Sequence, residues 1–123
     1  MTWFEIGHNS LQAAKRTLSE HPRSSASRAY YAAHVVLTEA LANEGWSAQT
    51  NSQTPPHHLQ AKLIGQYLSY KGDRFVRELR TLVRRLYDRR LDADYRRTVT
   101  VDRSIALDSV RDSTTVLIML GVR

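Results

Sequence analysis

The chain has 123 residues, enough for one domain with one hydrophobic core, and it contains no cysteine, which excludes disulfides and thiolate metal sites. Its longest apolar run, at 116–120, is far too short to cross a bilayer, so we expect a cytoplasmic protein without a membrane span. The net charge is +6, of which +5 falls in the segment 71–103 with its 11 basic and 6 acidic residues, and such a concentration favours nucleic acid or an acidic protein partner.

Two amphipathic helices are predicted in the first third of the chain. The first ends before Pro22, and its apolar residues follow one another at intervals of three and four: Phe4, Gly7, Leu11, Ala14 and Leu18. The second is expected over 24–44. Ser24 or Ser25 can serve as its N-cap, and Gly45 as its stop.

Three further helices and no strand are expected in the rest of the chain. A polar loop at 46–53, anchored by Trp46, leads to a short third helix over 54–70 that begins with a Thr-Pro pair. The fourth helix is predicted over 73–93, and a fifth closes the core with Ala106, Val110, Leu117 and Leu120. The sequence therefore predicts a single all-α domain over 1–123, a bundle of four to five helices.

The second helix has two occupied faces. One face carries an apolar stripe typical of a core-facing surface: Ala26, Tyr30, Ala33, Leu37, Ala40 and Leu41. Arg28, Tyr31 and Val35 lie on another flank, roughly 100–160° round the helix from Tyr30. We therefore expect a homodimer through this helix and the end of the fourth, which Val35→Glu should split by placing a charge in a closed contact.

The apolar stripe of the fourth helix is interrupted near its end. The stripe consists of Val76, Leu79, Val83, Leu86 and Tyr87. Continued at the same spacing, it reaches Arg90 and then Asp94, where a leucine would be expected. A charged pair in such a position marks either a functional site or an ion pair at spacing i,i+4 that fixes the helix end.

Two strings resemble the small prokaryotic HEPN proteins: Ser-Arg-Ala-Tyr-Tyr-Ala at 27–32 and Arg-Leu-Asp-Ala-Asp-Tyr at 90–95. The similarity extends to the order of the helices and to a histidine near the start of the third. It implies a helical bundle that forms a two-fold dimer, with a site in the dimer cleft near the end of the fourth helix. Many relatives are metal-independent ribonucleases of toxin–antitoxin, phage-defence or CRISPR-linked systems. The toxins are often paired with a small nucleotidyltransferase antitoxin.

The resemblance also implies roles for individual residues. Arg90 would hold the scissile phosphate, Asp94 and Tyr95 would orient or exchange protons, and Arg28 and Tyr31 would support them. Active HEPN ribonucleases carry a histidine four to six residues after the arginine, whereas no histidine follows Arg90 in this chain. An aspartate and a tyrosine are poor proton-transfer groups near pH 7. Tyr95 is also a candidate target for nucleotidylation, because related toxins are silenced at a tyrosine just after the motif.

The histidines offer no spacing typical of a metal site, and we expect neither a metal nor a cofactor. His34 follows Arg28 by six residues, which separates the two side chains by roughly 120° round a helix. We therefore interpret His34 as a hydrogen-bonded residue at the edge of the core. His57 and His58 lie near a helix start, where backbone N–H groups favour an anion; the alternative is a surface pair beside a cap.

Three functions remain open from the sequence. In the first, the protein acts on RNA, and Arg77, Arg80 and Arg84 form a basic groove rather than a solvated face. In the second, it is a non-catalytic HEPN module that binds a nucleotide or a partner nucleotidyltransferase. In the third, it is a plain helical interaction protein.

Overall fold

The computed structural model describes residues 2–47 and 54–122, and in these residues it contains five α-helices and no strand. The helices are α1 (Trp3–Arg16), α2 (Pro22–Asn43), α3 (Gln60–Tyr67), α4 (Asp73–Tyr95) and α5 (Arg103–Met119). Two short 3₁₀ turns, η1 (His57–Leu59) and η2 (Ser69–Lys71), flank α3. The predicted all-α bundle is confirmed. The loop expected at 46–53 lies mostly outside the described residues, although Trp46 packs against the core as predicted.

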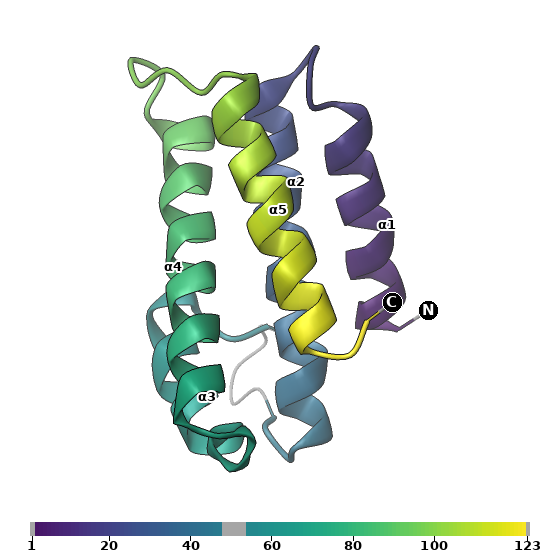
Figure 1. Cartoon of the computed structure of the whole chain (residues 1–123), viewed down its shortest axis with the longest axis vertical. Coiled ribbons are helices and arrows are strands. Elements are labelled where there is room, and N and C mark those ends of the chain that lie inside the picture. Colours follow the sequence, from purple (N-terminus) through teal and green to yellow (C-terminus); the bar gives the residue numbers. More distant parts are fainter. Residues whose placement is uncertain (1, 48–53, 123) are drawn as a thin grey trace.

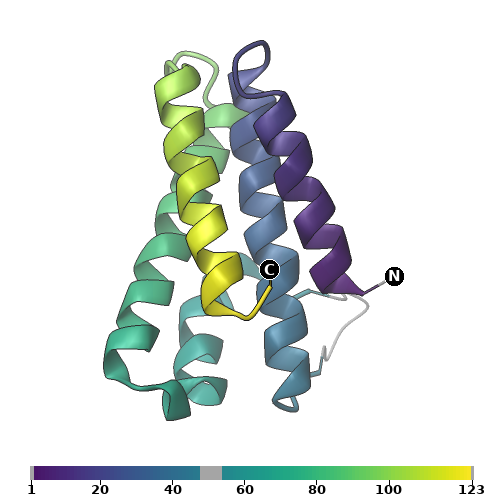
Figure 2. The ribbon, with the colours of Figure 1, turned by 45° about the vertical axis from the view of Figure 1, so that its right-hand side comes forward.

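The long helix α2 is the centre of the bundle. It contacts α1, α4 and α5. It runs behind α5 in Figure 1 and lies between α1 and α5 in Figure 2. Apart from Ala26, which belongs to a small second cluster, its apolar stripe packs into the main core, whose largest fully buried side chains include Leu37, Leu41, Ile64, Leu79 and Leu86. Among the described residues, no helix is both long and apolar enough to cross a membrane.

The start of α2 differs from the sequence prediction. The helix begins at Pro22, not at 24, and His21 is its N-cap. A proline fits the first helical position because the N–H group that it lacks would have no partner within the helix there. Neither predicted serine caps the helix: Ser25 is fully buried and donates a hydrogen bond to the carbonyl of Ala14, 2.7 Å away. At the other end, Gly45 has a φ of +100°, as expected for a helix stop.

The prediction that Val35 lies in a dimer contact is wrong. Val35 is fully buried within the chain, because α1 covers this side of α2. A Cβ built on Gly7 would approach one methyl group of Val35 to 3.3 Å. Val35→Glu would therefore disrupt the packing of α1 against α2, and it does not test a dimer. The third and fourth helices also differ in their bounds. The helix predicted over 54–70 begins only at His57 and is divided into η1, α3 and η2, the last of which ends at Lys71, and α4 continues to Tyr95.

Gly7 sets the close approach of α1 to α2. A Cβ at this position would collide with a methyl group of Val36 and would lie 3.0 Å from the carbonyl oxygen of Ala32. Because that oxygen belongs to the backbone of the central helix, we expect Gly7→Ala to lower the free energy of unfolding by about 2 kcal/mol, measured by urea denaturation. Asn9→Ala, on the exposed side of α1, is the control and should change it by less than about 0.5 kcal/mol.

Candidate functional site

The end of α4 and the start of α2 come together at one end of the bundle, at the top of Figure 1. Four side chains from these helices form a connected set there, which we call the Arg90 set: Ser27, Arg90, Asp94 and Tyr95. The Nε of Arg90 lies 3.1 Å from Oδ2 of Asp94, which also accepts a hydrogen bond of 3.0 Å from the hydroxyl of Ser27. Arg90 in addition donates to the hydroxyl of Tyr95 over 3.4 Å. The structure thus brings together all three residues at which the sequence predicted a catalytic site.

Two aromatic rings lie close to the guanidinium of Arg90. Its Cζ lies 5.7 Å from the ring centre of Tyr30 and 5.2 Å from that of Tyr95, distances at which a cation is attracted to a ring face. Tyr30 is buried, whereas Tyr95 is 68% exposed. The Arg90 side chain remains 30% exposed, as does that of Asp94. The i,i+4 ion pair considered from the sequence is therefore present, at the border between core and solvent.

Arg23 fixes the end of α4 from the first turn of α2. One of its terminal nitrogens donates to the carbonyls of Asp92, at 2.8 Å, and Ala93, at 3.1 Å. The other donates to the carbonyls of Arg97, at 3.2 Å, and Val99. The last carbonyls of a helix have no partner within the helix, so these bonds satisfy groups that solvent would otherwise have to satisfy. The sequence analysis did not identify Arg23, because no local pattern links it to residues some 70 positions away.

A polar and aromatic cluster lies beneath Arg90, and we call it the Gln60 cluster: Tyr30, His34, His57, Gln60 and Tyr87. The side-chain amide of Gln60 contacts Nδ1 of His34, which also lies 3.4 Å from the hydroxyl of Tyr30. The ring of His57 stacks on Tyr87. This confirms the interpretation of His34 as a hydrogen-bonded residue at the edge of the core. Gln60 and Tyr87 were not predicted to take part; Tyr87 was counted as part of the apolar stripe.

Burial sets the protonation of the Gln60 cluster. Desolvation, helped by the nearby charges of His57 and Arg90, lowers the pKa of His34 to about 4. Burial also lowers the pKa of His57 and raises the pKa of Tyr30. His34 is therefore neutral at pH 7, so a ring nitrogen of the imidazole can accept a hydrogen bond beside the cationic Arg90.

Arg28 and Tyr31 lie apart from Arg90. Both are exposed, and they line a shallow hollow on the side of α2 that faces α1, together with Asn9, Ser10, Ala13 and Ser27. The hydroxyl of Ser10 donates to the backbone carbonyl of Arg28. Within one chain, Ser27 is the residue that belongs both to this hollow and to the Arg90 set. The supporting role of Arg28 and Tyr31 stays a prediction.

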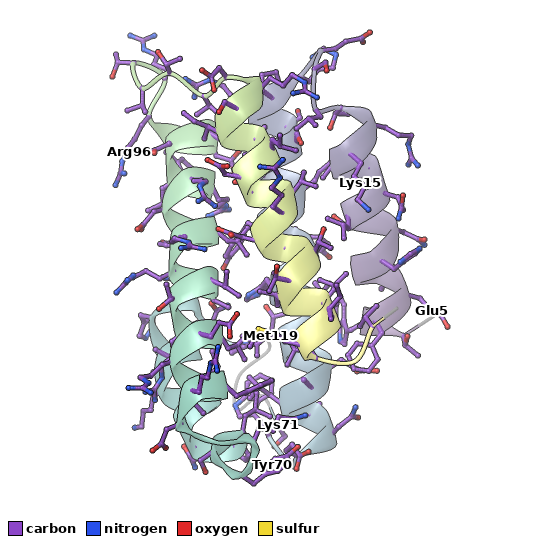
Figure 3. All side chains as sticks on the ribbon, in the orientation of Figure 1. Glu5, Lys15, Tyr70, Lys71, Arg96 and Met119 are labelled. Atoms are coloured by element: carbon purple, nitrogen blue, oxygen red, sulfur yellow. The ribbon has the colours of Figure 1, made fainter. Side chains whose placement is uncertain are left out.

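The arginines of α4 do not line a single groove. Arg80 and Arg84 line a pocket together with His58, whereas Arg77 lines a separate hollow with Arg74, Glu78, Thr81, Leu82 and Arg85. Nε of Arg80 donates to the carbonyl of Ala61 on α3, at 2.8 Å. The predicted basic surface is thus divided between two hollows along the first half of α4. Arg96, beyond the end of the helix, lies at the opposite end of α4 from Tyr70 and Lys71 (Figure 3).

In residues 2–47 and 54–122, no group of three or more His, Asp or Glu side chains is arranged to hold a metal ion. The chemistry that the Arg90 set can offer is a partly exposed cation with fixed direction, a carboxylate and a solvent-accessible phenol. Comparison with known proteins found no protein-family model and no curated protein that matches the chain. The likeness to HEPN proteins therefore stays a prediction from the sequence, carried by the strings at 27–32 and 90–95, the order of the helices and the histidine near the start of the third helix.

Proposed function

We propose that this protein acts on RNA as a homodimer of the HEPN type, with Arg90 as the residue that binds the scissile phosphate. The observation that carries the proposal is the fixed guanidinium of Arg90 at a partly exposed helix end, held by Asp94 and accompanied by two phenol rings. A guanidinium that is oriented in this way can offer paired N–H donors to a phosphate, which a lysine cannot copy.

The remaining residues of the set would take supporting parts in this function. Asp94, tied to Ser27 on α2, keeps the guanidinium from rotating. Tyr95 presents its hydroxyl beside Arg90 and is exposed enough to reach a bound ribose. Since no histidine follows Arg90 in the sequence, cleavage by this site should be slow. The positive charge concentrated in the segment 71–103 would attract the RNA, and affinity should fall steeply with salt.

The homodimer is part of the same proposal. Arg28 and Tyr31 are both open to solvent on α2, Tyr31 with 45% of its surface, so a second subunit could cover them. The fully buried Val35 would lie behind that contact and not in it. Light scattering at micromolar concentration that shows only a 14.1 kDa monomer would contradict the dimer.

A second candidate function is favoured by one observation, the exposure of Tyr95. With 68% of its surface accessible, this tyrosine could enter the active site of a partner nucleotidyltransferase. In that case the protein would be a non-catalytic module, or a toxin silenced by modification, and the nucleotidyl group would be found on the Tyr95 hydroxyl. Mass spectrometry of Tyr95→Phe beside the wild type, each incubated with such an enzyme, would locate the group.

Arg90→Lys distinguishes the two functions. If Arg90 binds the phosphate, this variant should keep the melting temperature but cleave RNA at least about tenfold more slowly, a loss of about 1.4 kcal/mol of transition-state stabilisation. Arg96→Lys is the matched control, because Arg96 also forms an i,i+4 ion pair, with Asp92, near the end of the same helix. It should cleave like the wild type.

Two outcomes would count against the first function. Rapid cleavage that persists unchanged in Arg90→Ala would remove Arg90 from the site. A purified wild type that leaves several single-stranded and structured RNAs intact would favour the second function.

A further inference from the structure

A pocket separate from the Arg90 set opens between α3 and the first half of α4. Its volume is about 300 Å³, at the lower end of the range for small-molecule sites. Figures 1 and 2 show α3 lying beside this half of α4. The pocket is lined by His57, His58, Gln60, Ala61, Ile64, Arg80, Thr81, Val83 and Arg84, among which there is no acidic residue.

Gln60 brings an unused hydrogen-bonding atom to this pocket. The residue is 1% exposed, and its Nε2 contacts Nδ1 of His34. Its Oε1 has no hydrogen bond of good geometry in the part of the chain that the structure describes, although the side chain of Gln60 also interacts with the ring of His57. A buried polar atom without a partner is destabilising, so a ligand that supplies a donor here would gain free energy.

Arg80 and Arg84 make one side of the pocket positively charged. Nε of Arg80 is held by the carbonyl of Ala61, and the absence of a side chain at Gly65 makes room for its guanidinium against α3. A Cβ at Gly65 would come within 3.2 Å of the guanidinium carbon. Arg84 lies one helical turn further along α4 and is exposed. Two cations at this spacing can both reach the oxygens of one small anion.

We infer that this pocket binds a small phosphate monoester with one apolar ring. The phosphate would lie against Arg80 and Arg84, beside His58. The ring would lie over Ala61, the exposed apolar residue of the lining, with the buried side chains of Ile64 and Val83 behind it. A hydroxyl or N–H on the ring would donate to Oε1 of Gln60. The volume limits the ligand to roughly one ring with its phosphate. This site does not depend on any activity at Arg90.

The test is calorimetric titration of the full-length protein with phenyl phosphate, phenol and inorganic phosphate. Phenyl phosphate should bind more tightly than either of the other two, because it alone fills both the charged and the apolar part. Arg84→Gln should weaken it by about tenfold or more, since one of the two cations is lost. Arg77→Gln is the matched control, an exposed arginine two turns earlier on the same helix and outside the pocket, and it should bind like the wild type.

Nuclear magnetic resonance gives an independent readout. On addition of phenyl phosphate, the side-chain amide of Gln60 and the backbone amide of Thr81 should shift, and those of Arg74 and Arg77 should not. Equal affinities for Arg84→Gln and Arg77→Gln would overturn the assignment, because they would mean that any surface arginine suffices. So would the absence of binding at millimolar phenyl phosphate.

Discussion

Arg23→Ala should lower the free energy of unfolding by about 3 kcal/mol, although Arg23 is not part of the hydrophobic core. Its two terminal nitrogens donate to five carbonyls at the end of α4 and in the turn that follows. Hydrogen bonds to a charged group contribute about 1.5–3 kcal/mol when they are shielded from solvent, and Arg23 is only partly shielded. Urea denaturation followed by circular dichroism would measure the loss.

Arg103→Ala is the control for this effect. Arg103 is exposed, and its side chain donates a hydrogen bond of 3.2 Å to the hydroxyl of Ser19. Its removal should change the free energy of unfolding by less than about 0.5 kcal/mol. Similar losses in the two variants would mean that Arg23 acts as an ordinary surface charge.

The second large effect concerns His34 and acid. Because burial lowers the pKa of His34 to about 4, below its usual 6.5, the unfolded chain binds a proton more readily than the folded one. Stability from this residue is therefore complete above about pH 6.5 and is lost as the pH falls towards 4. A shift of this size corresponds to about 3 kcal/mol.

His34→Gln isolates that contribution. The groups that face His34 are Tyr30 on its own helix, His57 and Gln60 from η1 and α3, and Arg90 from α4. All of them remain in the variant, so the difference between the unfolding free energies of the two proteins should shrink steadily from pH 7 to pH 4.5. If the two curves run parallel over this range, His34 is not the residue that titrates.

The helices and the core could be predicted because they follow from local periodicity. The stripes on α2 and α4 are continuous in sequence, and burial of one face of each helix is enough to define them. Two predicted details, the start of α2 and the place of Val35, were wrong for a physical reason. Pro22 begins a helix because its fixed φ suits a first turn, and Val35 is buried because Gly7 lets α1 approach closely.

The candidate site was predictable only in part. The pair Arg90 and Asp94 was visible because it interrupts a stripe at helical spacing. Arg23 and Gln60 were not, because their contacts join residues 26 or more positions apart and depend on how the helices pack. Tyr87 fits the apolar stripe and also stacks on His57, and periodicity alone reports the first of these roles.

Because Ser27 and Tyr30 contact it from another helix, the string at 90–95 does not form the site by itself. Both residues belong to α2, and they supply the hydrogen bond to Asp94 and one of the two rings beside Arg90. The same six residues transplanted into the helix of another protein would retain the ion pair but lose the hydroxyl and the ring. A search of other sequences for this site should therefore require a serine and a tyrosine three residues apart on a preceding helix, together with the arginine and the aspartate.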